Sequence, residues 1–153
     1  MEKHNKIYLG SDHAGFELKE KIRDFLKSSG YDFEDMGAFE YSAVDDYPDY
    51  AALVASKIAK TGDFGILVCG SGVGMCITAN KVKGIRAVNA CSVKIAQKSR
   101  EHNNTNILCL GQSYIDFETA KEIIKAWLST DFSTEEKHHI RVNKITEFEN
   151  KMI

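Results

Sequence analysis

The sequence predicts an α/β protein with a parallel sheet that is covered by helices on both faces. Short apolar runs alternate with longer segments in which apolar residues recur at helical spacing. The run FGILVC at 64–69 contains no polar residue, as expected for a strand buried on both faces. Because strands that alternate with helices are joined by crossover connections, they lie parallel in one sheet.

The first half of the chain supplies three of the expected strands and two helices. Strands are expected at 6–10, 31–37 and 64–70, the second being the weakest. The segment 16–30 places Leu18, Ile22 and Leu26 on one helical face, and 47–62 has the same periodicity. Glycine at positions 30 and 62 ends both helices.

The second half continues the alternation. Two more strands are expected at 85–90 and 106–111, and helices at 92–103, 117–130 and 135–153. No repeat, linker or low-complexity tract interrupts the pattern, so we expect one domain over 1–153.

Composition narrows the functional classes. The net charge of −2 gives no general attraction to nucleic acid or acidic membranes. The chain lacks an apolar run of roughly 18 residues, which a membrane helix needs, and its start, MEKHNK, lacks the apolar core of a secretory signal. The four cysteines form no C-x-x-C pair, which disfavours zinc-ribbon and thioredoxin sites. We therefore expect a cytoplasmic protein with reduced thiols, of which Cys76, Cys91 and Cys109 pack as small hydrophobic residues.

The loop CGSGVG at 69–74 follows the most apolar strand and precedes a helix. It is not a dinucleotide fingerprint, because Met75 stands where the third glycine belongs. It is not a P-loop, since Lys81 lies too far along, nor a nucleophile elbow, since Ser71 lacks flanking glycines at the required positions. An anion-binding turn that carries a thiol and a hydroxyl remains, against the alternative of a tight turn without a ligand. Amide dipoles in such a turn would favour the Cys69 thiolate, a nucleophile or general base.

Other candidate residues lie in three further segments. Asp12 and His13 in SDHAG follow the first strand and could move protons, although Asp12 also suits a helix N-cap. His102 with Asn103 ends a helix, and its place at the same sheet edge depends on that helix. Tyr47 could bind a ligand hydroxyl or simply pack. The basic segment KHHIRVNK could bind phosphate or form a solvated face.

The motifs together resemble the family of type B ribose-5-phosphate and galactose-6-phosphate isomerases. The matching stretches are GSDHAGFELK, DYPDYA, CGSGVGMCITANKVKGIRA, SREHNNTNILCLG and HHIRVNKI, in family order over nearly the whole chain. The resemblance implies a Rossmann-like three-layer α/β/α sandwich with a five-stranded parallel sheet. It also implies no cofactor or metal, and a homodimer or tetramer with sites at the subunit interface, where the C-terminal helix (about 134–153) would pack.

The resemblance also implies residue roles. Cys69 would be the base that removes the C2 proton, because Met75 occupies the position at which some members carry a glutamate base. His102 would open the sugar ring, with Asp12 nearby, and Ser71 would help hold the enediolate. The substrate-binding residues implied are His13, Tyr47, Asn103, Lys137, His138, Arg141 and the amides of Gly70, Gly72 and Gly74.

Two positions depart from the family pattern. Ser113 and Lys137 stand where many members carry arginine. Serine removes a positive charge from the phosphate site, and lysine keeps the charge but cannot donate two parallel hydrogen bonds as a guanidinium group does. The expected reaction is interconversion of ribose 5-phosphate and ribulose 5-phosphate through a cis-enediolate, a step of the pentose phosphate pathway. Galactose 6-phosphate or allose 6-phosphate remains an alternative substrate, and a non-catalytic sugar-phosphate sensor an alternative function.

Overall fold

The computed structural model describes residues 5–152, which contain one five-stranded parallel sheet. The strand order is β2-β1-β3-β5-β4. The strands are β1 (Ile7–Ser11), β2 (Phe33–Asp35), β3 (Phe64–Cys69), β4 (Ala87–Asn89) and β5 (Ile107–Gly111). The edge strands β2 and β4 are shorter than predicted, because each has a neighbour on one side only.

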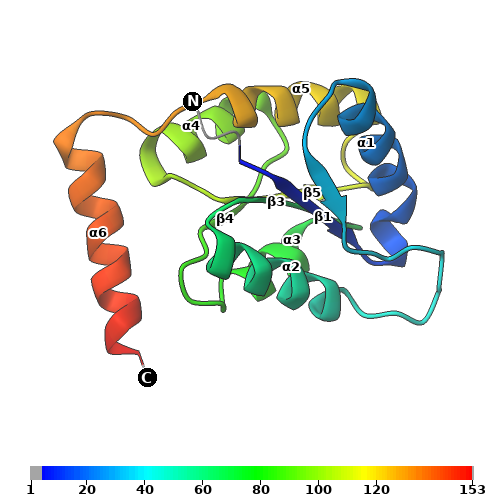
Figure 1. Cartoon of the computed structure of the whole chain (residues 1–153), viewed down its shortest axis with the longest axis horizontal. Helices are drawn as coiled ribbons and strands as arrows, with labels where there is room; N and C mark the ends of the chain where they lie inside the picture. Colours follow the sequence, from blue (N-terminus) through cyan, green and yellow to red (C-terminus); the bar gives the residue numbers. More distant parts are fainter. Residues whose placement is uncertain (1–4, 153) are drawn as a thin grey trace.

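Helices cover both faces of the sheet, which confirms the predicted three-layer α/β/α architecture. Figure 1 shows α1, α4 and α5 on one face and α2 and α3 on the other. After the short 3-10 turn η1 (His13–Gly15), the helices are α1 (Phe16–Ser28), α2 (Tyr47–Thr61), α3 (Val73–Ala79), α4 (Val93–Asn103), α5 (Phe117–Ser129) and α6 (Glu136–Lys151).

The two faces of β3 explain its apolar sequence. Ile66 and Val68 pack into the core under α1, α4 and α5, whereas Leu67 and Cys69 pack on the side of α2 and α3. All four side chains are buried, so neither face of the strand tolerates a polar residue. Cys69 therefore ends a rigid central strand, which fixes the position of its sulfur.

Helix α6 stands apart from the rest of the chain (Figure 1). Its side chains at His138 and Val142 are buried, but the apolar stripe of Ile145, Phe148 and Met152, which recurs at helical spacing, is exposed. The helix itself was predicted, whereas its stripe does not enter the core of the same chain. Within residues 5–152, no helix is both long and apolar enough to cross a bilayer.

Candidate active site

The carboxyl ends of three adjacent strands bring several predicted residues to one edge of the sheet. Ser11 at the end of β1 is paired with Val68, and Cys69 at the end of β3 is paired with Gly111 at the end of β5. Asp12, the glycine loop and the segment after β5 therefore lie along the same edge. This is where parallel α/β sheets bind ligands.

Two loops hold Cys69 in place. Its sulfur accepts a hydrogen bond from the Gly72 amide at 3.1 Å, and its carbonyl accepts one from the Gln112 amide at 2.9 Å. The side chain is buried. An amide that donates to sulfur stabilises the thiolate more than the thiol, because the negative charge strengthens the hydrogen bond. The glycine loop therefore points an N–H dipole directly at the Cys69 sulfur.

The glycines of the loop allow close contacts as well as turns. Gly72 has a φ of 78°, and a Cβ there would collide with the side-chain oxygen of Asn89. A Cβ at Gly74 would lie 2.5 Å from the Tyr47 ring, so Tyr47 packs directly against the loop. The Ser71 hydroxyl accepts a hydrogen bond from the Val73 amide at 3.2 Å. Tyr47 and Ser71 are thus brought to the same loop as Cys69.

Gly72→Ala is expected to lower the free energy of unfolding and the turnover together. The left-handed backbone alone costs roughly 1–2 kcal/mol with a Cβ, and the collision with Asn89 adds to this. Displacement of the Gly72 amide would also weaken its bond to the Cys69 sulfur. Urea unfolding measures the first effect, with Gly30→Ala as the matched control because Gly30 has a φ of 75° and open space around it. Equal destabilisation by the two variants would contradict the proposed collision.

Asp12 and His13 lie beside the glycine loop, and each has a defined partner. Asp12 is buried, and its Oδ1 accepts a hydrogen bond from the Gly15 amide at 3.1 Å, so it also acts as the predicted helix cap. Burial raises the pKa of Asp12, although the Gly15 amide opposes this. The His13 Nδ1 lies 2.6 Å from the Asp45 Oδ1, and this hydrogen bond raises the pKa of His13.

Among the described residues, one group of three His, Cys, Asp or Glu side chains lies close enough to hold a cation. It consists of Asp12, His13 and Asp45, whose possible ligand atoms lie within 4.8 Å of one another. The His13 Nδ1 faces the Asp45 carboxylate, so Nε2 is the only nitrogen of this ring that could reach a ligand.

His102 and Asn103 lie at the opposite edge of the sheet. They end α4, which leads into the amino end of β5 at Ile107. Arg86, just before β4, donates to the Asn103 carbonyl at 2.9 Å, which places this helix end beside the amino ends of the strands. The strand β5 has five residues. At about 3.3 Å per residue, its length alone separates the two edges of the sheet by roughly 16 Å. Within one chain, the structure therefore does not bring His102 to Cys69.

The remaining predicted residues gather around His102. The rings of His102 and His138 stack with centroids 4.2 Å apart, and His138 is buried. Burial lowers the pKa of His138, as does the positive charge that His102 can carry. Lys137 is paired with Glu135 at 2.8 Å, and Arg141 lies exposed on the same helix. The predicted site residues thus form two groups at opposite edges of the sheet.

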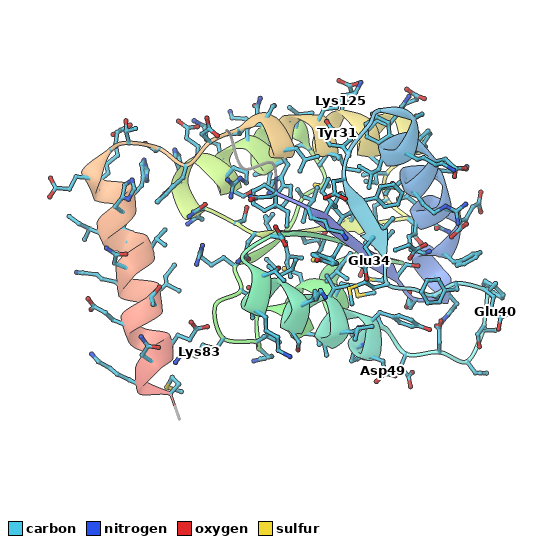
Figure 2. The ribbon with its side chains drawn as sticks, in the orientation of Figure 1. Tyr31, Glu34, Glu40, Asp49, Lys83 and Lys125 are labelled. Atoms are coloured by element: carbon cyan, nitrogen blue, oxygen red, sulfur yellow. The ribbon has the colours of Figure 1, made fainter. Side chains whose placement is uncertain are left out.

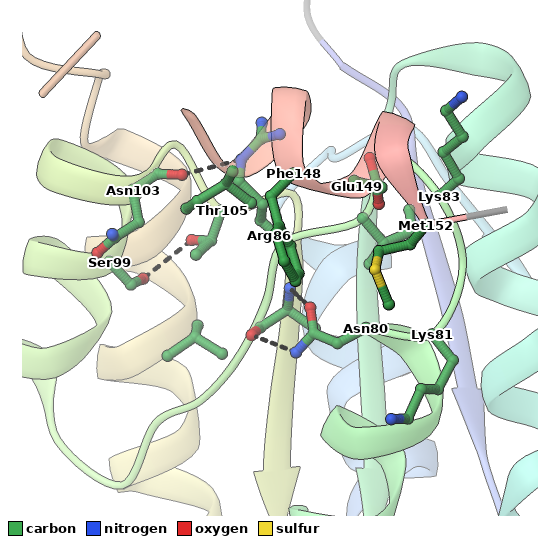
Figure 3. Close-up of a pocket in the computed structure, with 14 residues that line it drawn as sticks. Asn80, Lys81, Lys83, Arg86, Ser99, Asn103, Thr105, Phe148, Glu149 and Met152 are labelled. Carbon is green, nitrogen blue, oxygen red and sulfur yellow. Dashed lines mark hydrogen bonds between the residues drawn. The ribbon is translucent and has the colours of Figure 1, made fainter. Parts of the chain in front are cut away.

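A cavity of about 680 Å³ lies between α6 and the body of the chain. Figure 2 shows Lys83 on the segment that faces α6, and Figure 3 shows side chains of α6 facing this segment across the cavity. The cavity is lined on one side by Ile145, Phe148 and Glu149 of α6 and by Met152, which follows the helix. The residues opposite include Asn80, Lys81, Arg86 and Asn103. The exposed apolar stripe of α6 therefore lines a cavity on the side of His102, away from Cys69.

Comparison with known proteins now identifies the family. The profile described as Ribose/Galactose Isomerase matches residues 7–145. The chain belongs to this family. Its sequence motifs and its parallel sheet therefore belong to a known isomerase family, as the resemblance in the sequence implied.

Individual members of the ribose/galactose isomerase family are similar over their whole length. A Bacillus subtilis protein named putative sugar phosphate isomerase YwlF is 44% identical over 95% of this chain and 98% of its own. The ribose-5-phosphate isomerase B of Clostridium thermocellum has a TM-score of 0.92 at 42% identity, over 97% of this chain and 99% of its own. The Mycoplasma genitalium ribose-5-phosphate isomerase B, solved with bound ribulose-5-phosphate, has a TM-score of 0.92 at 40% identity, over 96% and 97% of the two chains.

Sequence reasoning missed two residues of the carboxyl edge. Asp45 binds His13, and the Gln112 side chain accepts a hydrogen bond from the Leu18 amide at 2.8 Å while its own amide holds Cys69. Asp45 lies just before DYPDYA, so the acidic residues that flank this motif were the available signal. Gln112 follows the fifth strand directly, a position at which parallel sheets commonly present functional side chains.

Proposed function

We infer that the protein is a type B ribose-5-phosphate isomerase that interconverts ribose 5-phosphate and ribulose 5-phosphate. The relatives named as ribose-5-phosphate isomerase B match nearly the entire chain, and one of them is described with bound ribulose-5-phosphate. The observation that carries the inference for this chain is the buried Cys69 sulfur, which accepts an amide hydrogen bond at the carboxyl edge of the sheet. Aldose–ketose isomerisation requires such a base beside an anion-stabilising loop.

In the mechanism that we propose, His102 protonates the ring oxygen and the bond from C1 to this oxygen breaks, while the C1 hydroxyl loses its proton to water as the open-chain aldehyde forms. The Cys69 thiolate then takes the proton from C2, and the electrons of the broken C–H bond form the enediolate double bond while the carbonyl oxygen becomes an oxyanion. Ser71 and the amides of the glycine loop stabilise this oxyanion. The Cys69 thiol returns the proton to C1, and Asp12, whose pKa is raised by burial, can relay a proton between the two oxygens. Met75 is fully buried and carries no basic group, which leaves Cys69 as the base.

We further propose that each site combines residues from two copies of the chain. Cys69 and His102 lie at opposite edges of one sheet, so a second copy must supply one of them if both act on the same sugar. A two-fold axis would place the His102 group of one copy over the Cys69 loop of the other. The exposed stripe on α6 supports this arrangement, because a second copy would cover its apolar side chains. A homodimer is the smallest such assembly, and a tetramer could contain two of them.

One observation favours a different phosphorylated sugar. The Ser113 hydroxyl lies 3.9 Å from where a Cβ of Gly70 would be, so it borders the glycine loop. A serine there provides no positive charge, which changes how the site holds a phosphate. Galactose 6-phosphate or allose 6-phosphate is therefore the second candidate substrate. We also propose a cytoplasmic location, since all four cysteines are free thiols.

Incubation of the purified protein with ribose 5-phosphate tests the proposed function. We expect ribulose 5-phosphate to form, with a higher kcat/KM for ribose 5-phosphate than for galactose 6-phosphate or allose 6-phosphate. A reversed order would reassign the substrate, and turnover of none of the three would contradict the enzyme assignment.

A further inference from the structure

His13 is held by a single carboxylate oxygen from a distant part of the chain. Asp45 Oδ1 accepts a hydrogen bond from the His13 backbone amide at 2.9 Å and another from the His13 Nδ1 at 2.6 Å. Asp45 lies in the segment between β2 and α2, whereas His13 follows β1. The two bonds fix both the backbone and the ring of His13. Because Nδ1 is committed to Asp45, Nε2 is the ring nitrogen left for a ligand.

The burial of Asp45 makes this interaction important for the carboxylate itself. Its side chain is 10% exposed, against 33% for His13. Its second oxygen, Oδ2, is buried and has no hydrogen-bond partner among residues 5–152. A buried carboxylate with one unsatisfied oxygen needs a positive partner close to the other oxygen. The His13 ring, whose Nδ1 lies 2.6 Å from Oδ1, provides that partner when it is protonated.

The surrounding groups also favour a protonated His13. The hydrogen bond to Asp45 raises the pKa of His13, and the negative charge of Asp12 raises it further, against the opposing effect of desolvation. The Tyr41 ring packs against the His13 ring in a T-shaped arrangement, with the centroids 6.2 Å apart. Tyr50 lies beside Asp45 as well. Burial, the charge of Asp45 and a side-chain interaction with this carboxylate raise the pKa of Tyr50, so its hydroxyl stays neutral near neutral pH.

We propose that Asp45 is a positioning residue of the active site, which holds the His13 ring so that Nε2 presents a proton to an anionic oxygen of the sugar phosphate. This proposal rests on the proposed function, because it assumes an anionic substrate at the carboxyl edge. His13 lies at that edge with Asp12 and the Cys69 loop. An imidazolium N–H donated to an anionic oxygen is a charge-assisted hydrogen bond, which is stronger and more directional than a neutral one.

The direction of the pH effect follows from the pKa of His13. With Asp45 present, His13 remains protonated to a higher pH, and substrate binding is favoured throughout that range. Asp45→Asn removes the charge but keeps the shape, so the pKa of His13 falls and the proton is lost at lower pH. At pH about 7.5, we expect the KM for ribose 5-phosphate to rise roughly 3- to 10-fold, as for loss of a charge-assisted hydrogen bond. The kcat should change much less, because Asp45 does not touch the reacting carbons.

A double-mutant cycle separates positioning from a general structural role. The four proteins are wild type, Asp45→Asn, His13→Gln and the double variant. If Asp45 acts through His13, Asp45→Asn should raise the KM in the wild-type background and have almost no further effect after His13→Gln. Asp49→Asn is the matched control, since Asp49 is an exposed carboxylate at the start of α2 (Figure 2). Additive effects of the two substitutions on KM would overturn the proposal.

The NMR titration of the His13 ring provides a readout that does not depend on turnover. We expect the His13 Cε1–H resonance to titrate at lower pH in Asp45→Asn than in wild type, with Asp49→Asn close to wild type. An unchanged titration curve in Asp45→Asn would overturn the proposal even if the enzyme is active. Conversely, a shifted curve in a protein that turns over none of the three sugar phosphates would contradict the proposed function and leave the Asp45–His13 pairing intact.

Discussion

Cys69→Ala is expected to lower kcat by about 10²- to 10⁴-fold, the range observed when a general acid or base is removed. Alanine cannot accept the C2 proton, and the fully buried Met75 beside the loop offers no replacement base. The Gly72 amide would also lose its sulfur partner. Because the substitution removes a single atom from a packed core, the protein should remain folded. Steady-state kinetics and circular dichroism measure the two effects.

Cys109→Ala is the matched control for this variant. Cys109 is buried in the same core cluster on β5, but it faces the interior and not the glycine loop. Its removal should affect stability in a similar way and leave kcat near that of the wild type. Near-normal turnover in folded Cys69→Ala would contradict the assignment of Cys69 as the base.

A mixture of Cys69→Ala and His102→Ala should recover activity that neither variant has alone. In a mixed dimer, one site would receive alanine at both positions and the other would receive both native residues. Random exchange of subunits makes half of the dimers mixed, so the mixture should regain about one quarter of the wild-type activity. The measurement is turnover after the two variants are unfolded and refolded together.

In the control experiment, Cys69→Ala is mixed with a double variant that carries both Cys69→Ala and His102→Ala. No combination with Cys69→Ala then contains Cys69, and no activity should return. If mixed dimers form and recover no activity in the first experiment, the two residues do not act in one shared site, and the two-copy arrangement is wrong.

The sheet and its carboxyl edge could be predicted because they depend on local patterns. Five apolar runs, with glycine after two helices, specify the β–α alternation, and parallel pairing then brings Asp12 and Cys69 to one edge. The break in the dinucleotide fingerprint at Met75 could be read directly from the sequence. These inferences needed no knowledge of which distant side chains meet.

The rest depends on contacts that a linear pattern does not encode. His102 has the residue type of a catalytic acid, but the direction of α4 carries it to the amino edge. The stripe of Ile145 and Phe148 has core periodicity, yet it stays exposed on a helix that the chain does not cover. Asp45 forms a hydrogen bond with His13 although the two residues are 32 positions apart in the sequence, and Asp45 lies in a segment without regular structure. The sequence singled out His102 and His13 as candidate site residues, but it did not show which side chains lie next to them.

Incubation with ribose 5-phosphate in D2O, followed by NMR, tests the central claim most directly. A base that shuttles the proton through an enediolate exchanges it with solvent, so deuterium should appear at C1 of the ribulose 5-phosphate formed and at C2 of the recovered ribose 5-phosphate. Both signals should be lost with Cys69→Ala. A folded wild-type protein that binds ribose 5-phosphate but yields neither product nor deuterium exchange would contradict the account, and would indicate a sugar-phosphate sensor instead.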